Sequence, residues 1–248
     1  MCTVTWSASP SGYHLFMNRD ELSTRGEAIP PSVHREGDVS YVAPIDSDAG
    51  GTWIAANEHG VTVCLLNYFP PGFSWSSGEE YTSRGKLVTD LIAHRSAAEV
   101  TAALLRMDVT RYRPFTLFTM GGGSVPRRHR WNGSGFLETR DAPAPPLASS
   151  GFDRDAVIAA RTTTYSQIVG DQPTPELLAR YHRSHLPERG PYSVCAHRDD
   201  GGSRSLTHVN VDENRIVLEY TAGPPCEGGE TCSAEIARDA NSGYDRER

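Results

Sequence analysis

The sequence predicts an α+β fold in which antiparallel sheets are covered by layers of helices. Short apolar runs with strand character gather near both ends of the chain, and helical patterns lie between them. Short turn-forming segments, such as residues 9–12, join neighbouring runs and favour hairpins. This order of elements argues against repeating βαβ units and a parallel sheet.

Four short strands are expected in the first part of the chain. Residues 3–6 and 13–16 form one hairpin, and residues 52–56 and 61–66 form a second around the turn signal at 57–60. The segment between the hairpins, residues 29–48, is rich in proline and charge. We therefore expect it to be mostly loop.

Helices and one buried strand are expected in the middle of the chain. Residues 85–94 place four apolar side chains on one face, and residues 97–107 follow a capping box made by Ser96 and Glu99. Residues 115–120 form a continuous apolar run typical of a buried strand. A helix is also expected at 153–169, after a connection at 141–146.

The last third of the chain begins with a helix over 175–185, with Thr174 as its cap and Pro175 in its first turn. Three strands are then expected, at residues 192–197, 205–211 and 215–220. From Cys226 onward the chain is rich in Glu, Gly, Ser and Asp. We therefore expect one domain over residues 1–225 and a flexible C-terminal tail over 226–248.

Charge and composition exclude several classes of protein. The 24 Lys and Arg residues against 31 Asp and Glu residues give a net charge of −7, which disfavours nucleic acid and anionic membranes as partners. No apolar run suits a transmembrane segment, and the polar residues 18–21 interrupt any signal peptide. These features predict a cytoplasmic protein.

The cysteines and histidines give no recognisable metal or disulfide motif. Five cysteines, an odd number without CxxC spacing, disfavour a disulfide scaffold and a structural zinc site and fit a reducing compartment. His182 and His185 have HxxH spacing, but no neighbouring residue completes a ligand set. We therefore expect neither a metal nor a cofactor.

The thiol of Cys2, directly behind the initiator methionine, has two interpretations. If the first hairpin turns near residues 9–12, paired residue numbers sum to about 21, which places Cys2 opposite or near Arg19. Removal of Met1 would leave Cys2 with a nucleophilic thiol and an α-amine whose pKa is near 8. Arg19 would then favour the thiolate, and Asp20 would orient the amine. Alternatively, Cys2 is a small apolar residue that begins a buried strand.

Five segments together resemble the NRDE family, also called the Transport and Golgi organisation protein 2 family. They are MCTVTW at residues 1–6, FMNRDE at 16–21, AGGTWIAANEHGVTVCLLN at 49–67, SRGKL at 83–87 and YSVCAHRD at 192–199. The family is similar to the choloylglycine hydrolases and the penicillin acyltransferases, which are N-terminal-nucleophile hydrolases. The resemblance implies their four-layer α-β-β-α sandwich.

The resemblance also implies roles for individual residues. Cys2 matches the nucleophile, and Arg19 and Asp20 match an Arg and an Asp beside it. Asn67 matches a donor to the oxyanion, although an asparagine at a strand end is also a common turn residue. The sequence departs from the relatives at residues 147–150, where they carry a second Asn and this segment ends in two serines, and a downstream Arg of the relatives corresponds to Arg161. Substrate contacts are expected from Asn18, Ser150 and Arg161.

Two functions follow from these matches. In the first, the protein is a cysteine amide hydrolase or acyl transferase that acts on a small acyl amide or thioester. In the second, it binds and carries haem or a lipid-like acyl compound without catalysis. A small molecule is the expected partner in both cases, and the oligomeric state is left open.

Overall fold

The computed structural model describes residues 2–72, 80–121, 123–135 and 137–239, which form two antiparallel seven-stranded sheets. The first sheet has the order β10-β1-β2-β12-β13-β14, with β11 paired to β12. Its strands are β1 (Cys2–Ser9), β2 (Gly12–Leu22), β10 (Leu147–Ser149), β11 (His197–Arg198), β12 (Gly201–Val211), β13 (Arg215–Ala222) and β14 (Thr231–Ala237).

The second sheet follows the order of the chain from β3 to β9. Its strands are β3 (Ile29–Glu36), β4 (Val39–Ile45), β5 (Ile54–Asn57), β6 (Thr62–Asn67), β7 (Phe115–Gly121), β8 (Ser124–Trp131) and β9 (Leu137–Asp141). The helices are α1 (Gly85–Leu91), α2 (Ala97–Leu104), α3 (Arg154–Ile168) and α4 (Pro175–His182), with short 3-10 turns η1 (Val109–Arg111) and η2 (Pro225–Glu227).

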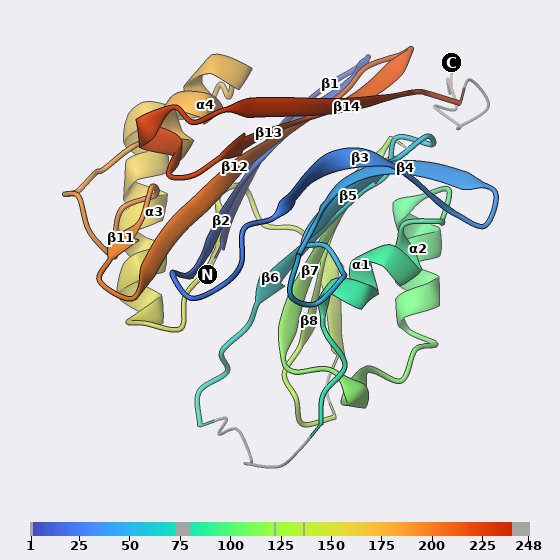
Figure 1. Cartoon of the computed structure of the whole chain (residues 1–248), viewed down its shortest axis with the longest axis horizontal. Coiled ribbons are helices and arrows are strands. Elements are labelled where there is room, and N and C mark those ends of the chain that lie inside the picture. Colours follow the sequence, from blue (N-terminus) through green and yellow to red (C-terminus); the bar gives the residue numbers. More distant parts are fainter. Residues whose placement is uncertain (1, 73–79, 122, 136, 240–248) are drawn as a thin grey trace.

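The elements stack in four layers, as Figure 1 shows. The central core lies between the two sheets and includes Leu15 and Met17 of β2 against Leu66 of β6. Helices α1 and α2 cover the outer face of the second sheet, and α3 and α4 cover the outer face of the first. The fold is therefore the α-β-β-α sandwich that the sequence led us to expect.

Alternation along β1 divides its side chains between two layers. Cys2, Val4 and Trp6 belong to the core between the sheets. Thr3 and Thr5 point the other way, where they contact Arg161 of α3 and His182 of α4. This period of two is the ordinary consequence of strand geometry.

Three segments differ from the sequence predictions. Residues 29–48, expected as loop, form β3 and β4, because β3 is an edge strand whose register shift between Ile29 and Ser32 accommodates the prolines. The strand expected at 192–197 is reduced to β11, which begins at His197. Residues 226–239, expected as part of a flexible tail, instead form η2 and β14, and β14 pairs with β13 beyond the expected domain end at 225.

The other expected elements are present with small changes of boundary. Ser96 caps α2 by accepting a hydrogen bond from the Glu99 backbone N–H (3.1 Å), and Thr174 caps α4 by accepting one from the Leu177 N–H (3.3 Å). Among the described residues, no helix is both long enough and apolar enough to cross a bilayer.

Candidate active site

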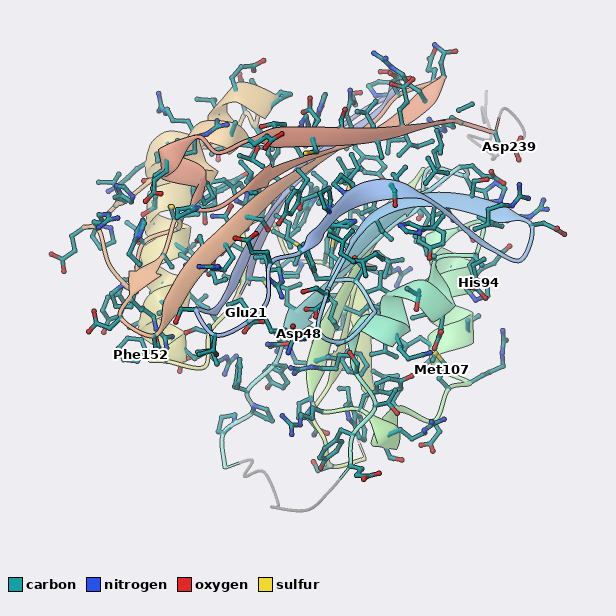
Figure 2. The ribbon with its side chains drawn as sticks, viewed as in Figure 1. Glu21, Asp48, His94, Met107, Phe152 and Asp239 are labelled. Atoms are coloured by element: carbon teal, nitrogen blue, oxygen red, sulfur yellow. The ribbon has the colours of Figure 1, made fainter. Side chains whose placement is uncertain are left out.

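A cavity of about 400 Å³ lies between residues of both sheets, a volume typical of small-molecule sites. Figure 2 labels Glu21, on its wall, and Asp48, in the loop after β4. The described residues that line the cavity are Cys2, Arg19, Asp20, Glu21, Arg25, Asp46, Ala49, Thr52, Trp53, Leu65, Asn67, Tyr81, Thr82, Ser83, Arg84, Gly85 and Arg113.

Cys2 begins β1 in the interior of the first sheet. It is paired with Arg19 of β2 on one side and with Ser149 of β10 on the other. The predicted pairing of Cys2 with Arg19 is therefore confirmed. The Cys2 backbone N–H donates a hydrogen bond to Oγ of Ser149 (3.1 Å), so a hydroxyl lies at the nitrogen of the candidate nucleophile.

The environment of the Cys2 thiol favours its protonated form. Burial is the largest effect and raises the pKa of Cys2. The charge of the chain's amino terminus acts to lower this pKa, whereas the charges of Asp20 and Glu21 act to raise it. Arg19 is paired with Asp46 and does not reverse this shift in the chain that carries Met1. The expected effect of Arg19 on the thiol once Met1 is removed stays a prediction. A neutral thiol of this kind needs a base to become a nucleophile.

Arg19 is held by a carboxylate on the opposite wall of the cavity. Its Nη2 donates to Oδ2 of Asp46 (2.8 Å), and its guanidinium stacks 4.6 Å from the centre of the Trp53 ring. Arg25 donates to the same carboxylate through Nη2 (2.8 Å to Oδ1). Burial acts to raise the pKa of Asp46, but the bonds and charges of Arg25 and Arg19 outweigh burial and lower it. Asp46 therefore stays ionised and fixes both arginines.

Asp20 is tied to helix α3 behind the cavity. Its Oδ2 accepts a hydrogen bond from Nη1 of Arg161 (3.1 Å), and its Oδ1 accepts one from Oγ of Ser203 (2.7 Å). The same Nη1 of Arg161 donates to Oγ1 of Thr3, next to Cys2 (2.5 Å). The side chains of both Asp20 and Arg161 are almost fully excluded from solvent. This buried ion pair therefore fixes the strand positions on either side of the thiol.

Asn67 is the last residue of β6 and lines the cavity with Cys2. Within the described part of the chain, its side-chain amide makes no hydrogen bond. An asparagine amide has two N–H donors, so Asn67 can donate to a ligand without losing a bond to any described residue.

Part of the cavity wall carries arginine side chains that include Arg84 and Arg113. Arg84 donates its hydrogen bond within the described residues to the Pro114 carbonyl (2.9 Å), and it forms no ion pair there. Burial lowers the pKa of Arg84 to about 10, and the charge of Arg113 adds to this effect. An anionic ligand group beside Arg84 would counter both effects and favour its charged form.

Close backbone contact positions Arg84. A Cβ on Gly51 would lie 2.6 Å from the carbonyl carbon of Gly85, and the Thr52 N–H donates to the Gly85 carbonyl (3.3 Å). Glycine at position 51 allows this approach, and a Cβ on Gly85 would make a tight contact of 3.0 Å with the Thr52 nitrogen. The start of α1 therefore lies against the chain just before β5.

The three residues expected to bind substrate lie outside the cavity lining. Asn18 donates to the carbonyls of His182 and Val194 (2.9 and 3.0 Å). Ser150 bonds to the backbone of Phe152. Arg161 holds Asp20. The period of two in β2 explains the first case, because Asn18 points to the helices and Arg19 to the cavity.

Sequence reasoning missed several residues of the site. Ser149 is one residue from the expected Ser150, a difference that only the register of β10 decides. Asp46 lies just beyond β4, in the segment predicted from the sequence to be mostly loop. Arg84 belongs to the SRGKL segment that carries part of the family resemblance, but nothing in that segment indicates that its side chain lines a cavity.

The sequence model of a protein family matches the first half of the chain. The Transport and Golgi organisation 2 family model covers residues 1–127. The chain belongs to this family. The expected resemblance is thus confirmed, whereas a search of curated proteins gives no match.

Solved structures with this fold include N-terminal-nucleophile hydrolases. A mutant of the conjugated bile acid hydrolase from Clostridium perfringens has a TM-score of 0.56 and 9% identity, with 98% of each chain covered. The N-acylethanolamine-hydrolyzing acid amidase orthologue from Caenorhabditis elegans has a TM-score of 0.61 and 12% identity over 84% of this chain and 92% of its own. At such identities, this member of the Transport and Golgi organisation 2 family shares the fold of these enzymes.

Proposed function

We propose that the protein is a cysteine N-terminal-nucleophile hydrolase or acyl transferase that acts on a small acyl amide or thioester. The observation that carries this proposal is the position of Cys2. Cys2 and Asn67 line the same cavity. The hydroxyl of Ser149 accepts a hydrogen bond from the Cys2 backbone N–H.

In the first half of the proposed reaction, Met1 has been removed and the α-amine of Cys2 takes the thiol proton. The sulfur attacks the acyl carbonyl carbon, and the carbonyl π electrons move to oxygen. Asn67 donates to this oxyanion, an interaction worth about 3–4 kcal/mol in comparable sites. The tetrahedral intermediate then expels the amine or thiol leaving group, which takes the proton from the α-ammonium.

The second half resolves the thioester on Cys2. Water, or an acceptor amine in the case of transfer, gives its proton to the α-amine and attacks the thioester carbonyl. The cysteine sulfur leaves and regains the proton. Ser149 supports this cycle, because its hydroxyl can hold the α-amine in the place that the Cys2 backbone N–H occupies. Arg19 and Asp20 take no part in the bond changes and position the strand beside Cys2. Arg19 is held by Asp46, and Asp20 is held by Arg161.

The arginines of the cavity wall narrow the class of substrate. Arg84 and Arg113 both line the cavity, and Arg84 suits a carboxylate or another anionic group of the substrate. We therefore propose an acyl compound that carries one such group.

A non-catalytic carrier of haem or of a lipid-like acyl compound is the second proposal. The same arginines support it, because haem also bears carboxylates. Turnover separates the two proposals, since a carrier binds its ligand but leaves it unchanged.

Cys2→Ala and Asn67→Ala test the catalytic proposal on a panel of acyl amides and acyl thioesters. Cys2→Ala should abolish turnover, because it removes the group that forms the thioester. Asn67→Ala should lower kcat by about 10² to 10³, the usual effect of losing an oxyanion donor. Ligand affinity and fold should change little in either variant, because both groups act on the transition state.

Cys232→Ala, on β14 and outside the cavity lining, is the matched control and should retain full turnover. Haem binding is measured in parallel by absorbance. If the wild-type protein converts no member of the panel and yet binds haem or an acyl compound at micromolar concentration, the carrier proposal replaces the catalytic one.

A further inference from the structure

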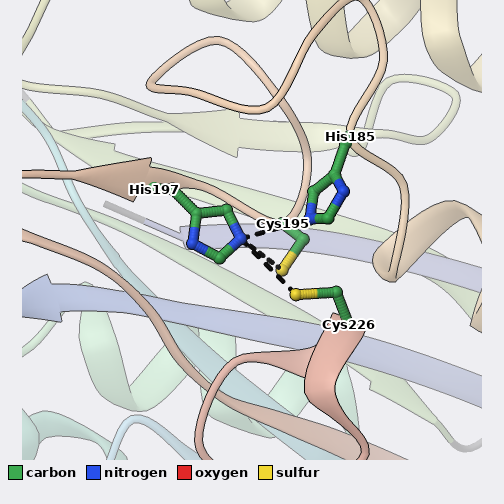
Figure 3. Close-up of side chains that lie close together, drawn as sticks. All are labelled: His185, Cys195, His197 and Cys226. Carbon is green, nitrogen blue, oxygen red and sulfur yellow. Dashed lines mark hydrogen bonds between the residues drawn. The ribbon is translucent and has the colours of Figure 1, made fainter.

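Four potential metal ligands converge at a place that the proposed reaction does not use. They are His185, Cys195, His197 and Cys226, whose ligand atoms all lie within 4.8 Å of one another. Figure 3 shows the two imidazole rings and the two thiols directed toward one common point.

The distances match a tetrahedral zinc site. Nε2 of His197 lies 3.2 Å from Nε2 of His185, 3.6 Å from Sγ of Cys195 and 3.5 Å from Sγ of Cys226. With zinc–nitrogen and zinc–sulfur bonds of about 2.05 and 2.3 Å, tetrahedral angles require nitrogen–nitrogen separations of about 3.3 Å and nitrogen–sulfur separations of about 3.5 Å.

Hydrogen bonding alone accounts poorly for this arrangement. A neutral histidine nitrogen carries either one proton or one lone pair, whereas Nε2 of His197 has three polar neighbours at bonding distance. A cation at the centre would use one lone pair from each of the four ligands. Two cysteines and two histidines are also a ligand set that zinc prefers.

The four ligands come from three separate segments of the chain. His185 follows α4, Cys195 and His197 lie around the start of β11, and Cys226 lies in η2 between β13 and β14. Cys195 and His197 are two residues apart, and Nε2 of His197 lies 3.6 Å from Sγ of Cys195. Their partners are distant in sequence, which is why no zinc motif is visible there.

The cluster lies where the chain has little regular structure. Residues 183–196 connect α4 to β11 without helix or strand, a length at which loops need another source of order. The same loop supports the active-site strands, because the Val194 carbonyl accepts from Asn18 and the Ala196 N–H donates to Oγ of Ser203, the residue that holds Asp20. A metal bound to this loop would hold Ala196 in place and so stabilise Ser203, which donates a hydrogen bond to Asp20.

We propose that His185, Cys195, His197 and Cys226 bind one structural zinc ion. All four positions are filled by protein ligands, so the site has no open position for a substrate. The site is separate from the cavity, since none of the four residues lines it. This proposal is independent of whether the protein is a hydrolase or a carrier.

The test measures metal in the untagged, full-length protein. Mass spectrometry of the purified wild-type chain should find about one zinc ion per chain. Cys226→Ser and His185→Asn should each reduce this to less than about a tenth, because three ligands hold structural zinc much more weakly. The matched controls, Cys232→Ser and His208→Asn, lie outside the cluster and should keep the wild-type zinc content.

Cobalt substitution tests the geometry without any variant. After chelation of the native metal, Co²⁺ added to the wild-type protein should give the intense visible bands of a tetrahedral site and a sulfur-to-cobalt charge-transfer band. Zinc content near zero in the wild type, zinc unchanged in Cys226→Ser, or octahedral cobalt bands would each overturn the proposal. A Cys195–Cys226 disulfide in the freshly purified chain would also overturn it.

Discussion

Successive side chains of β2 next to Cys2 point alternately toward the cavity and toward the helices. Arg19 faces the cavity and is neutralised by Asp46, whereas Asp20 reaches Arg161 of the helical layer. The charge of Arg19, the cross-strand neighbour of Cys2, is therefore balanced, and burial raises the pKa of the thiol. A nucleophile in this setting depends on a general base, and the α-amine of Cys2 is the base that the proposed mechanism supplies.

Arg84→Gln is expected to discriminate between anionic and neutral substrates. Loss of a charge-assisted hydrogen bond, worth about 1.5–3 kcal/mol, should raise KM for a carboxylate-bearing acyl substrate by about ten- to a hundredfold. A neutral analogue of the same substrate should be unaffected. Arg127→Gln, an exposed residue of β8 paired with Asp141, is the control. Equal losses on both substrates would assign Arg84 a structural role.

Helix α4 is attached to the first sheet by a polar contact as well as by apolar packing. Nε2 of His182 bonds to Oγ1 of Thr5 (2.8 Å), and Nδ1 bonds to Oδ1 of Asn18 (2.9 Å). Burial lowers the pKa of His182 to about 3, and the charge of Arg161 adds to this effect. The helix is therefore docked by a neutral imidazole.

His182 should make the protein less stable as the pH falls from about 6.5 toward 3. In that window the unfolded chain takes up a proton at His182 and the folded chain does not, so unfolding is favoured by acid. The free energy of unfolding should fall by about 3–5 kcal/mol once His182 is fully protonated in the unfolded state. Denaturant unfolding of the wild type and of His182→Gln at several pH values measures it. Parallel curves for the two proteins would contradict the prediction, and His34→Gln, at a partly exposed position, serves as control.

Elements formed by local contacts can be predicted from this sequence, whereas edge strands and contacts between distant segments cannot. The spacing of the first hairpin predicts Cys2 opposite or near Arg19, and the observed register pairs the two residues, because both strands and their turn are local. The strand β14 was missed because its polar sequence alternates on an exposed edge, where burial leaves no apolar run. The two prolines of β3 suggested loop, yet an edge strand tolerates them. Asp46, Arg84 and the proposed zinc ligands meet only through contacts between distant segments, which a single sequence does not display.

At the scale of the whole molecule, the sandwich brings the start of the chain into its interior. β1 lies between β10 and β2 rather than at an edge, and Cys2 joins the core between the sheets. The cavity lies beside this buried strand start, with one wall from each sheet. A chain that begins in such a place can use its own terminus as a catalytic group, provided that nothing precedes Cys2.

Removal of Met1 should therefore increase turnover without changing the free energy of unfolding. Two preparations of the same chain test this: one released from a cleavable N-terminal tag so that Cys2 is the first residue, and one that keeps a single residue in front. Intact mass identifies each form. The form that begins at Cys2 should turn over its acyl substrate at least about 10²-fold faster, because general-base catalysis contributes about 10²- to 10⁴-fold. Both should unfold at the same denaturant concentration, since the Cys2 nitrogen can bond to Ser149 in either form. Equal turnover by the two forms would show that the α-amine is not the base and would leave the raised pKa of the Cys2 thiol without a group to overcome it.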